Sequence, residues 1–350
     1  MKKLLGIIFV LLPAALLLTG CLTSQPDCST AGVICVGLVT DVGKVDDKSF
    51  NQSAWEGVQN AKRDGYADWA QYIETARAQD VDQSIALFAN AGYSIIVTVG
   101  SDLGDSTRAA AAEYPNTRFI GVDQYQDPTK PTPANLVGLN FPEDQAGFLV
   151  GALAAMMSQS HKIGAVCGSD ALPADWRYCE GYKAGAAYAD QQKGTRTEVT
   201  VVYHDDVDIT QAFLDQPWGA ATADAMITKG VDVVFGAGGE TGNGAIIEAA
   251  QRGADVIGSD TDQYLTLPVA APKMITCAIK LIAPGVQDLI EATKNGQFPS
   301  GNYVGQAGFS PYHDQDSNIP PDVRDLMARI NKGLLDGSLQ TGVSNSKPSP

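Results

Sequence analysis

The stretch DVGKVDDKSFNQSAWEGVQNA, residues 41–61, joins an apolar run, VICVGLVT, to an amphipathic helical pattern. A plain connection between a buried strand and a helix needs only a few polar residues and a capping side chain. This one contains three acids, two lysines, a Phe and an Asn within residues 41–51, up to the first residues of the expected helix. The excess of chemically active side chains indicates a loop that holds something as well as connecting two elements.

Outward from this loop, apolar strand-like runs alternate with helical patterns along most of the chain. In the first series we expect strands at residues 32–39, 70–74, 94–99, 118–122 and 136–141, and helices at 49–64, 80–91, 106–113 and 143–159. In the second we expect strands at residues 162–167, 199–203, 231–235 and 255–258, and helices at 180–191, 216–229 and 243–252. Repeated alternation of this kind predicts mostly parallel sheets covered by helices on both faces. Two series predict an α/β protein with two doubly wound lobes.

The N-terminus has the order of a secretory signal: MKK, then LLGIIFVLLPAALLL, then LTGC ending at Cys21. The last four residues resemble a bacterial lipobox, which implies cleavage before Cys21 and lipidation of its sulfur. The alternative is an ordinary cysteine just after a signal sequence or anchor helix. With lipid attached, residues 22–32 would form a flexible tether to the extracytoplasmic face of the cell membrane.

Charge and cysteine content exclude some classes of protein. The formal charge of −16 becomes −18 once Lys2 and Lys3 are removed, which argues against binding to nucleic-acid phosphates. An exported chain can form disulfides, and Cys167 with Cys179, which flank one loop, is the preferred pair. Cys28 with Cys35 is the weaker alternative. No cysteine or histidine spacing resembles a zinc site, so we expect no metal.

Ligands of doubly wound sheets bind beyond the carboxyl ends of the strands, so the residues that follow each strand are the candidates for a site. They include the carboxylates Asp41, Asp123 and Asp260, which suit vicinal hydroxyls but equally suit helix caps. They also include two rings, Phe50 and Phe235, which could sandwich a flat ligand. Phe50 could instead be a hydrophobic staple, and Phe235 could simply close the core.

Signals for catalysis are weak. The three histidines lie outside the strand-end loops, and no G-x-S-x-G elbow is present. Cys277 lies in an apolar run typical of a core position. The glycine-rich loop GAGGETGNG, residues 236–244, matches neither the dinucleotide fingerprint nor the P-loop, and a tight turn would explain it as well as a ligand. We therefore expect a binding protein without a cofactor rather than an enzyme.

The opening stretch resembles the signature of the basic membrane protein family, lipoproteins similar to the purine nucleoside receptor of spirochaetes. Further pieces agree in order: FIGVDQ, NLVGLNFPEDQAGFLVGALAA, CEGYKAGA, GVDVVFGAGGETGNGAI and IGSDTDQ. The resemblance implies the substrate-binding component of an ABC importer, with two α/β lobes that close about a hinge. It implies an N-terminal lobe at residues 33–158, a C-terminal lobe at 159–288, a segment at 289–342 that returns across the hinge, and a disordered tail at 343–350.

The resemblance also implies roles for particular residues. A purine base would lie between Phe50 and Phe235, with Asp123 at the base edge. Ribose would be held by Asp41, Asp260 and a lysine, for which Lys280 is the better match and Lys273 the competitor. The remaining expected members of the cleft are Asn51, Gly239 and Trp176. In the family the glycine-rich loop usually reads AGGTGNG, so Glu240 departs from the pattern.

The expected partners are a nucleoside, a membrane permease and, through the lipid, the membrane itself, with the protein a monomer. Two other classes stay open at this point. A signalling receptor would have the same pocket without an importer, and a nucleoside hydrolase would need a water-activating group and would release free base.

Overall fold

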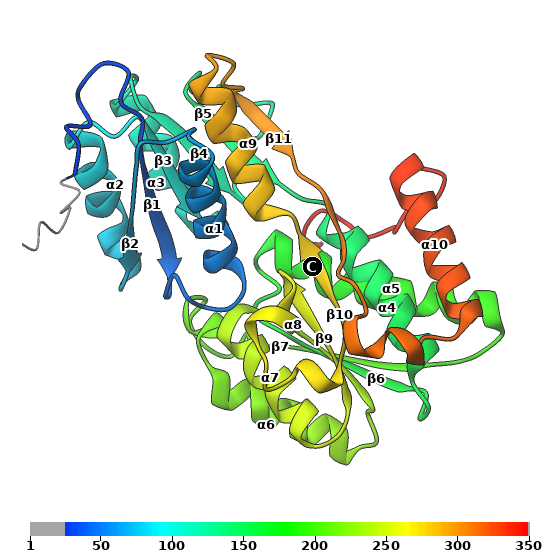
Figure 1. Cartoon of the computed structure of the whole chain (residues 1–350). Helices are drawn as coiled ribbons and strands as arrows, with labels where there is room; N and C mark the ends of the chain where they lie inside the picture. Colours follow the sequence, from blue (N-terminus) through cyan, green and yellow to red (C-terminus); the bar gives the residue numbers. More distant parts are fainter. Residues whose placement is uncertain (1–24, 349–350) are drawn as a thin grey trace, which may run out of the picture.

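The computed structural model describes residues 25–348. Cys21 and its predicted lipidation lie outside this range. The chain forms two six-stranded sheets, one in each lobe (Figure 1). The predicted α/β class with two doubly wound lobes is confirmed.

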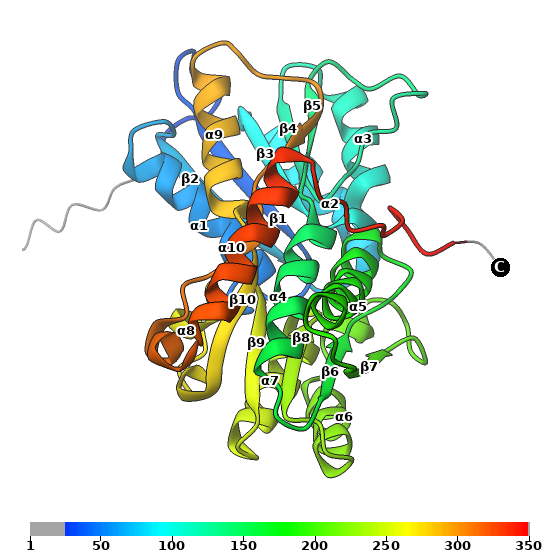
Figure 2. The same ribbon diagram turned by 90° about the vertical axis from the view of Figure 1, so that its right-hand side faces the viewer.

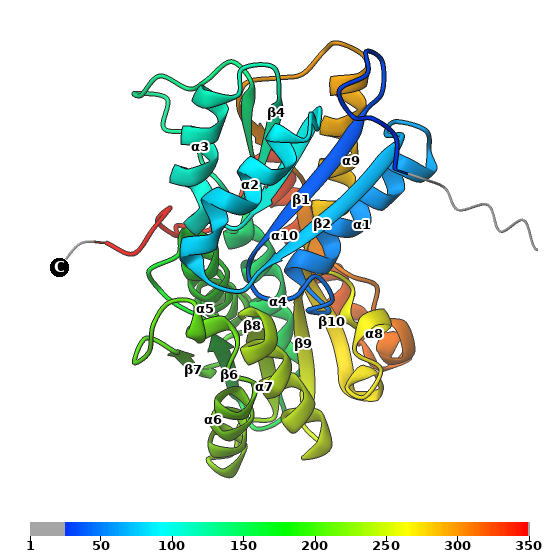
Figure 3. The same cartoon turned by 90° about the vertical axis from the view of Figure 1, so that its left-hand side faces the viewer.

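The N-terminal lobe is built on an all-parallel sheet in the order β11-β5-β4-β3-β1-β2. Its strands are β1 (Cys35–Val42), β2 (Trp69–Thr75), β3 (Ile95–Val99), β4 (Arg118–Val122), β5 (Leu136–Asn140) and β11 (Gly301–Val304). Helices α1 (Phe50–Arg63) and α9 (Ile282–Lys294) pack on one face, and α2 (Val81–Asn90) and α3 (Gly104–Glu113) on the other (Figure 3). Because both faces are covered, the central strands are continuous apolar runs.

The C-terminal lobe repeats this plan in the order β12-β10-β9-β8-β6-β7, with only β12 antiparallel. Its strands are β6 (Lys162–Cys167), β7 (Glu198–Tyr203), β8 (Val233–Ala237), β9 (Asp255–Asp260), β10 (Met274–Lys280) and β12 (Ala307–Phe309). Helices α4 (Glu143–Met157), α5 (Pro173–Lys193) and α10 (Pro321–Asp336) cover one face, and α6 (Gln216–Thr228) and α7 (Gly239–Gln251) the other. Shorter turns of helix complete the chain: α8 (Gln263–Thr266), η1 (Ala78–Asp80), η2 (Ser101–Leu103), η3 (Gln211–Phe213), η4 (Ala271–Lys273) and η5 (His313–Asn318).

The two lobes are interleaved in sequence, and the expected boundaries each misplace one helix. Helix α4 packs against α5, β10 and β12, so the chain enters the C-terminal lobe just after β5 rather than at residue 159. Helix α9 packs against α1, so the chain has already returned to the N-terminal lobe well before residue 289. The chain crosses once more between β11 and β12 (Figure 2). Helical periodicity identifies a buried face but not the sheet that the face covers.

Helices α4 and α5 approach backbone to backbone through glycines on both helices. A Cβ atom added to Gly151 would lie 2.0 Å from the Tyr182 carbonyl oxygen, and one added to Gly185 would lie 1.9 Å from that of Phe148. No side chain can occupy these positions without moving a helix. The pair therefore forms a rigid layer under the carboxyl ends of the C-terminal sheet.

Substituting Gly185→Ala should lower the free energy of unfolding by about 1–3 kcal/mol, because the added methyl group overpacks a backbone contact. Gly308→Ala is the matched control, since nothing lies within 4 Å of a Cβ added there. Denaturant unfolding of both variants measures the difference. Equal stability of the two variants would contradict the close approach.

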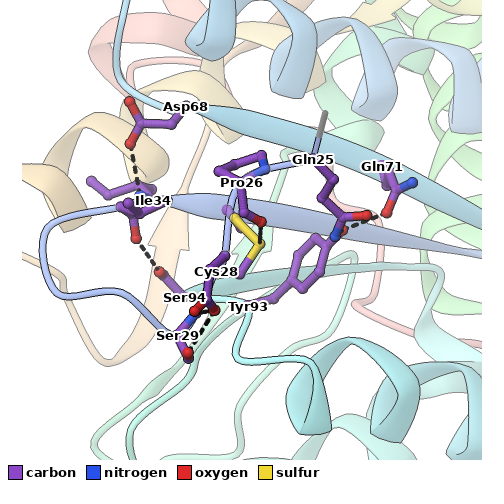
Figure 4. Close-up of a disulfide and its surroundings, with 12 residues drawn as sticks. Gln25, Pro26, Cys28, Ser29, Ile34, Asp68, Gln71, Tyr93 and Ser94 are labelled. Atoms are coloured by element: carbon purple, nitrogen blue, oxygen red, sulfur yellow. Dashed lines mark hydrogen bonds between the residues drawn. A yellow bond between two sulfur atoms is a disulfide. The ribbon is translucent and has the colours of Figure 1, made fainter. Parts of the chain in front are cut away.

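Both candidate disulfides are present, Cys167–Cys179 and Cys28–Cys35. The second disulfide joins the N-terminal segment to Cys35 at the start of β1 (Figure 4). Beside it, Gln25 Nε2 donates a hydrogen bond to the Tyr93 hydroxyl at 3.2 Å. Residues 25–32, expected as part of a flexible tether, are thus attached to the lobe.

Cys277 is buried and unpaired within residues 25–348, and burial raises the pKa of its thiol to about 12, as suits a core residue. Across the same residues no helix is both long and apolar enough to span a membrane.

Candidate functional site

A cavity lies between the lobes where the carboxyl ends of both sheets meet. The N-terminal lobe contributes residues at or after the ends of β1, β3 and β4, and the C-terminal lobe contributes residues at or after the ends of β6, β7, β8, β9 and β10. The cavity encloses about 810 Å³ of space between atoms, its opening to solvent included. The side chains used below all line it: Asp41, Phe50, Asn51, Asp102, Asp123, Asp175, Tyr178, Phe213, Gly239, Glu240, Asp260 and Lys280.

The loop at residues 43–49 joins the two lobes as well as bordering the cavity. The Ser49 hydroxyl donates to Asp260 Oδ2 at 2.8 Å, and Asn243 Nδ2 donates to the Asp47 carbonyl at 2.9 Å. The Thr266 hydroxyl donates to the Lys48 carbonyl at 2.8 Å. The loop therefore contacts the C-terminal lobe through the Ser49 hydroxyl and through the backbone carbonyls of Asp47 and Lys48.

Asp47 also caps helix α1. Its carboxylate accepts from the backbone N–H groups of Ser49 at 2.9 Å, Asn51 at 2.8 Å and Gln52 at 3.1 Å. These are the N–H groups that a helix start leaves without partners. Burial nevertheless raises the pKa of Asp47 to about 6. The cap fixes the direction of α1 and places Phe50 at the cavity.

Lys280 forms the centre of a buried charge cluster. Its Nζ lies 2.6 Å from Asp123 Oδ2, 3.5 Å from Asp260 Oδ1 and 4.6 Å from the centre of the Phe50 ring. Burial alone would lower the pKa of Lys280, but Asp123, Asp260 and Glu143 together raise it above its ordinary value, so the ammonium stays charged. The competing Lys273 instead pairs with Asp255 at 3.5 Å and does not line the cavity.

The two acids of this cluster have unusual backbones. Asp123 has φ +58° and Asp260 has φ +65°, in the left-handed region that side chains other than glycine rarely adopt. Asp123 stands directly after β4, and Asp260 is the last residue of β9. Strained residues held by their surroundings concentrate at ligand sites, which marks these two as candidates independently of their charge.

Asp41 lies in a second polar group with Asn51. Asn51 Nδ2 donates to Asp41 Oδ1 at 2.7 Å. Burial raises the pKa of Asp41 to about 8, and the negative charges of Asp102, Asp47 and Asp260 add to the effect. Burial likewise raises the pKa of Glu143 to about 8, with Asp123 adding to it.

These raised pKa values predict how stability depends on pH. The unfolded chain releases the Asp41 proton near pH 3.8, while the folded chain keeps it until about pH 8. The ligand-free protein should therefore become less stable as the pH rises from about 5 to 8, by up to ~1.4 kcal/mol per pH unit for each such group. Asp41→Asn should flatten this slope, whereas Asp46→Asn, at an exposed side chain, should leave it unchanged. Urea unfolding at several pH values is the measurement, and equal slopes for all three proteins would contradict the shift.

Phe235 does not reach the cavity, which corrects the expected ring sandwich. It is fully buried in the core under α4 and α5, with its ring 5.3 Å from that of Tyr182 and stacked on it. Two rings of the C-terminal lobe line the cavity instead, Phe213 from η3 and Tyr178 from α5. Phe213 packs over Gly168, where an added Cβ would lie 2.2 Å from the ring. The signal for Phe213 in the sequence was an aromatic residue in an acid-rich loop, HDDVDITQAFLD, at residues 204–215.

Trp176 also lies away from the cavity. Its ring stacks on Tyr203 with centres 6.3 Å apart, and its Nε1 donates to the Ser344 hydroxyl at 3.2 Å. The tail expected to be disordered thus contacts α5 at Ser344, and Lys347 pairs with Asp170 in the loop before that helix. On the same helix Asp175 and Tyr178 face the cavity instead, and sequence reasoning missed both.

Solved structures similar to this chain share its two-lobed, periplasmic type I-like fold. An ABC transporter solute-binding protein from Aeropyrum pernix K1 superimposes with a TM-score of 0.77 at 24% identity, covering 88% of this chain and 92% of that one. The glucose-galactose binding protein GanP from Geobacillus stearothermophilus gives 0.57 at 14% identity, covering 81% and 99%.

Sequence comparison identifies the family. The family described as "ABC transporter substrate-binding protein PnrA-like" matches residues 34–305, and the chain belongs to it. Relatives include the CD4+ T-cell-stimulating antigen of Listeria innocua, 30% identical over 87% of both chains. They also include the ABC transporter nucleoside-binding protein BmpA of Lactococcus lactis, 29% identical over 97% of this chain and 98% of that one. The resemblance seen in the sequence is confirmed, and the family is one of substrate-binding proteins rather than enzymes.

Proposed function

We propose that this substrate-binding protein takes up a purine nucleoside in the cavity between its lobes and presents it to an ABC permease. The observation that carries the proposal is the pairing of Phe50 and Phe213, rings from opposite lobes that line one cavity. Aromatic rings on two sides suit the flat face of a base. The Lactococcus relative described as nucleoside-binding supports the same class of ligand.

The charge cluster suggests how the two parts of a nucleoside would be held. Asp123 and Asp260 flank Lys280, and carboxylates beside an ammonium group match the donors and acceptors of a vicinal diol. We therefore assign the sugar hydroxyls to this cluster, and the base edge to the Asp41–Asn51 pair. This exchanges the expected roles of Asp41 and Asp123, because Lys280 groups Asp123 with Asp260.

Calorimetric titration tests the function. The unlipidated mature chain, residues 21–350 with Cys21→Ser, would be stripped of carried-over ligand and titrated with adenosine, guanosine, inosine, cytidine, uridine and ribose. We expect tight binding of purine nucleosides and no response to ribose. A folded protein that binds none of the six would overturn the proposal. Hypoxanthine release from inosine would instead reveal a hydrolase.

We further propose that the protein is a monomer held by a lipid on Cys21 at the outer face of the cell membrane. The motif LTGC carries this proposal. Cys21→Ala should move the protein from the membrane fraction to the medium or to the soluble extracytoplasmic fraction, because it removes the sulfur that would carry the lipid and with it the hydrophobic attachment. Immunoblots of the two fractions measure it, with Cys277→Ala as the control that should stay on the membrane.

A further inference from the structure

The function proposed above uses several polar residues of the cavity but not Asp175. Asp175, in the first turn of α5, lines the cavity and is only 7% exposed. Its Oδ2 atom is buried and has no hydrogen-bond donor among residues 25–348. A buried acceptor left without a partner costs free energy in the unliganded protein, so it points to a donor on the ligand.

The acceptors near Lys280 indicate which hydroxyl of the ligand still needs a hydrogen-bond partner. Asp260 uses Oδ1 toward Lys280 and Oδ2 toward Ser49, and Asp123 uses Oδ2 toward Lys280. Asp123 Oδ1 is a second buried acceptor without a donor in the described part of the chain. The acids that flank Lys280 are placed for a vicinal diol. Ribose in a nucleoside has one further hydroxyl, on its hydroxymethyl group, and Asp175 offers it a buried carboxyl oxygen that has no other partner in the described residues.

Resting on the proposed function, we propose that Asp175 hydrogen-bonds to the 5′-hydroxyl of the nucleoside sugar and so makes the site selective for nucleosides over 5′-nucleotides. Asp260 and Lys280 are among the charges that act most strongly on Asp175, which places it at the sugar end of the cavity. A phosphate at this point would meet the negative charge of Asp260 in a buried setting, where like charges repel strongly.

The electrostatics of Asp175 suit a hydroxyl partner. Burial, and then the charge of Asp260, raises the pKa of Asp175 well above the ordinary value, which favours the neutral form of its carboxyl. A neutral carboxyl can both donate and accept, and a hydroxyl can do the same. A phosphate dianion would instead need positive partners, and the described lining of the cavity contains more acids than lysines.

A purely structural role makes a different prediction. An acid in the first turn of a helix stabilises the positive end of the helix dipole, and its loss would weaken the binding of every ligand by a similar factor. Ratios of affinities between analogues separate the two roles, because a contact with one hydroxyl changes only the ratio that involves that hydroxyl.

The test measures the affinity of the best purine nucleoside from the panel, its 5′-deoxy and 2′-deoxy forms, and its 5′-phosphate. The wild-type protein should bind the 5′-deoxy form about tenfold more weakly than the parent, the loss of one hydrogen bond. In Asp175→Leu that ratio should fall to near one while the 2′-deoxy ratio is retained. Asp175→Asn, which still donates and accepts, should keep most of the wild-type ratio. Asp170→Asn, which alters the same loop at a residue that pairs with Lys347 outside the cavity, is the matched control.

The outcomes distinguish failure of the proposed nucleoside binding from failure of the role assigned to Asp175. If the wild-type protein binds no nucleoside, the proposed function fails and this inference fails with it. If it binds nucleosides but Asp175→Leu keeps the 5′-deoxy ratio, or loses the 2′-deoxy ratio instead, only the assignment of Asp175 is overturned. Tight binding of the 5′-phosphate by the wild-type protein would also overturn it. Thermal unfolding without ligand shows that Asp175→Leu is folded, and Asp175→Asn provides the second variant if it is not.

Discussion

Replacing Lys280 with methionine should abolish ligand binding and lower the free energy of unfolding by about 3–5 kcal/mol, as expected when one partner of a buried ion pair is removed. Lys280 is 3% exposed in its side chain and lies 2.6 Å from Asp123 and 3.5 Å from Asp260. Its removal leaves these two carboxyls buried without positive charge. It also removes the ammonium group that we assign to the sugar hydroxyls.

The pH dependence of this loss is a second signature. Burial already raises the pKa of Asp123 and Lys280 opposes that rise, so in Lys280→Met the pKa should rise further. A carboxyl that stays protonated in the folded state destabilises the protein as the pH rises above the unfolded pKa of about 3.9. The deficit should therefore be smaller at pH 5 than at pH 8 in denaturant unfolding.

Lys273→Met supplies the control for the lysine assignment. Lys273 pairs with Asp255 at 3.5 Å, and its side chain is 41% exposed. An exposed pair is worth about 0–1 kcal/mol, so stability and ligand affinity should both change little. Loss of binding in Lys273→Met with binding retained in Lys280→Met would reverse the assignment of the two lysines.

Two phenylalanines of the C-terminal lobe should respond to truncation in opposite ways. Phe213→Ala should weaken nucleoside binding by about 1–3 kcal/mol, the usual value of a base–aromatic stack, with a smaller effect on folding. Phe235→Ala should lower the free energy of unfolding by about 3–5 kcal/mol, because it opens a cavity in a closed core. Phe235 is 0% exposed and stacks on Tyr182, whereas Phe213 lines the ligand cavity.

Calorimetry and denaturant unfolding on both variants separate these effects. The affinity of Phe235→Ala for the nucleoside should be measured well below the unfolding temperature of the variant. Otherwise, weak binding caused by unfolding would be mistaken for the loss of a contact with the ligand. Phe50→Ala is the matched partner in the N-terminal lobe and should resemble Phe213→Ala. A folded Phe235→Ala protein with normal stability and weak binding would instead support the expectation from the sequence that the base stacks between Phe50 and Phe235.

The sequence by itself determined the class of fold and the N-terminal half of the cavity. Asp41, Phe50 and Asn51 follow one strand in an unbroken run, so local order alone brings them to the end of β1. Asp123 and Asp260 were found in the same way, because each stands at the carboxyl end of a strand. In a parallel sheet that position is fixed by chain direction, which a sequence pattern records. Lys280 was assigned only through the family resemblance.

Only the tertiary structure decided which neighbours of those strand ends face the ligand. Phe235 and Phe213 are both aromatic residues of the C-terminal lobe. Phe235 lies on the side of β8 that packs against α4 and α5, so it is buried in the core. On α5, adjacent residues point about 100° apart, as 3.6 residues per turn require. Trp176 therefore meets Tyr203 and the tail, while Asp175 meets the cavity.

The same limit applies to the lobes themselves. Helices α4 and α9 have apolar faces that either sheet could cover, and only packing against α5 or α1 assigns each to a lobe. Periodicity reports that a face is buried, since burial depends on the hydrophobicity of one segment. The identity of the burying partner depends on shape and contact between segments far apart in the chain, and that information exists only once the chain has folded.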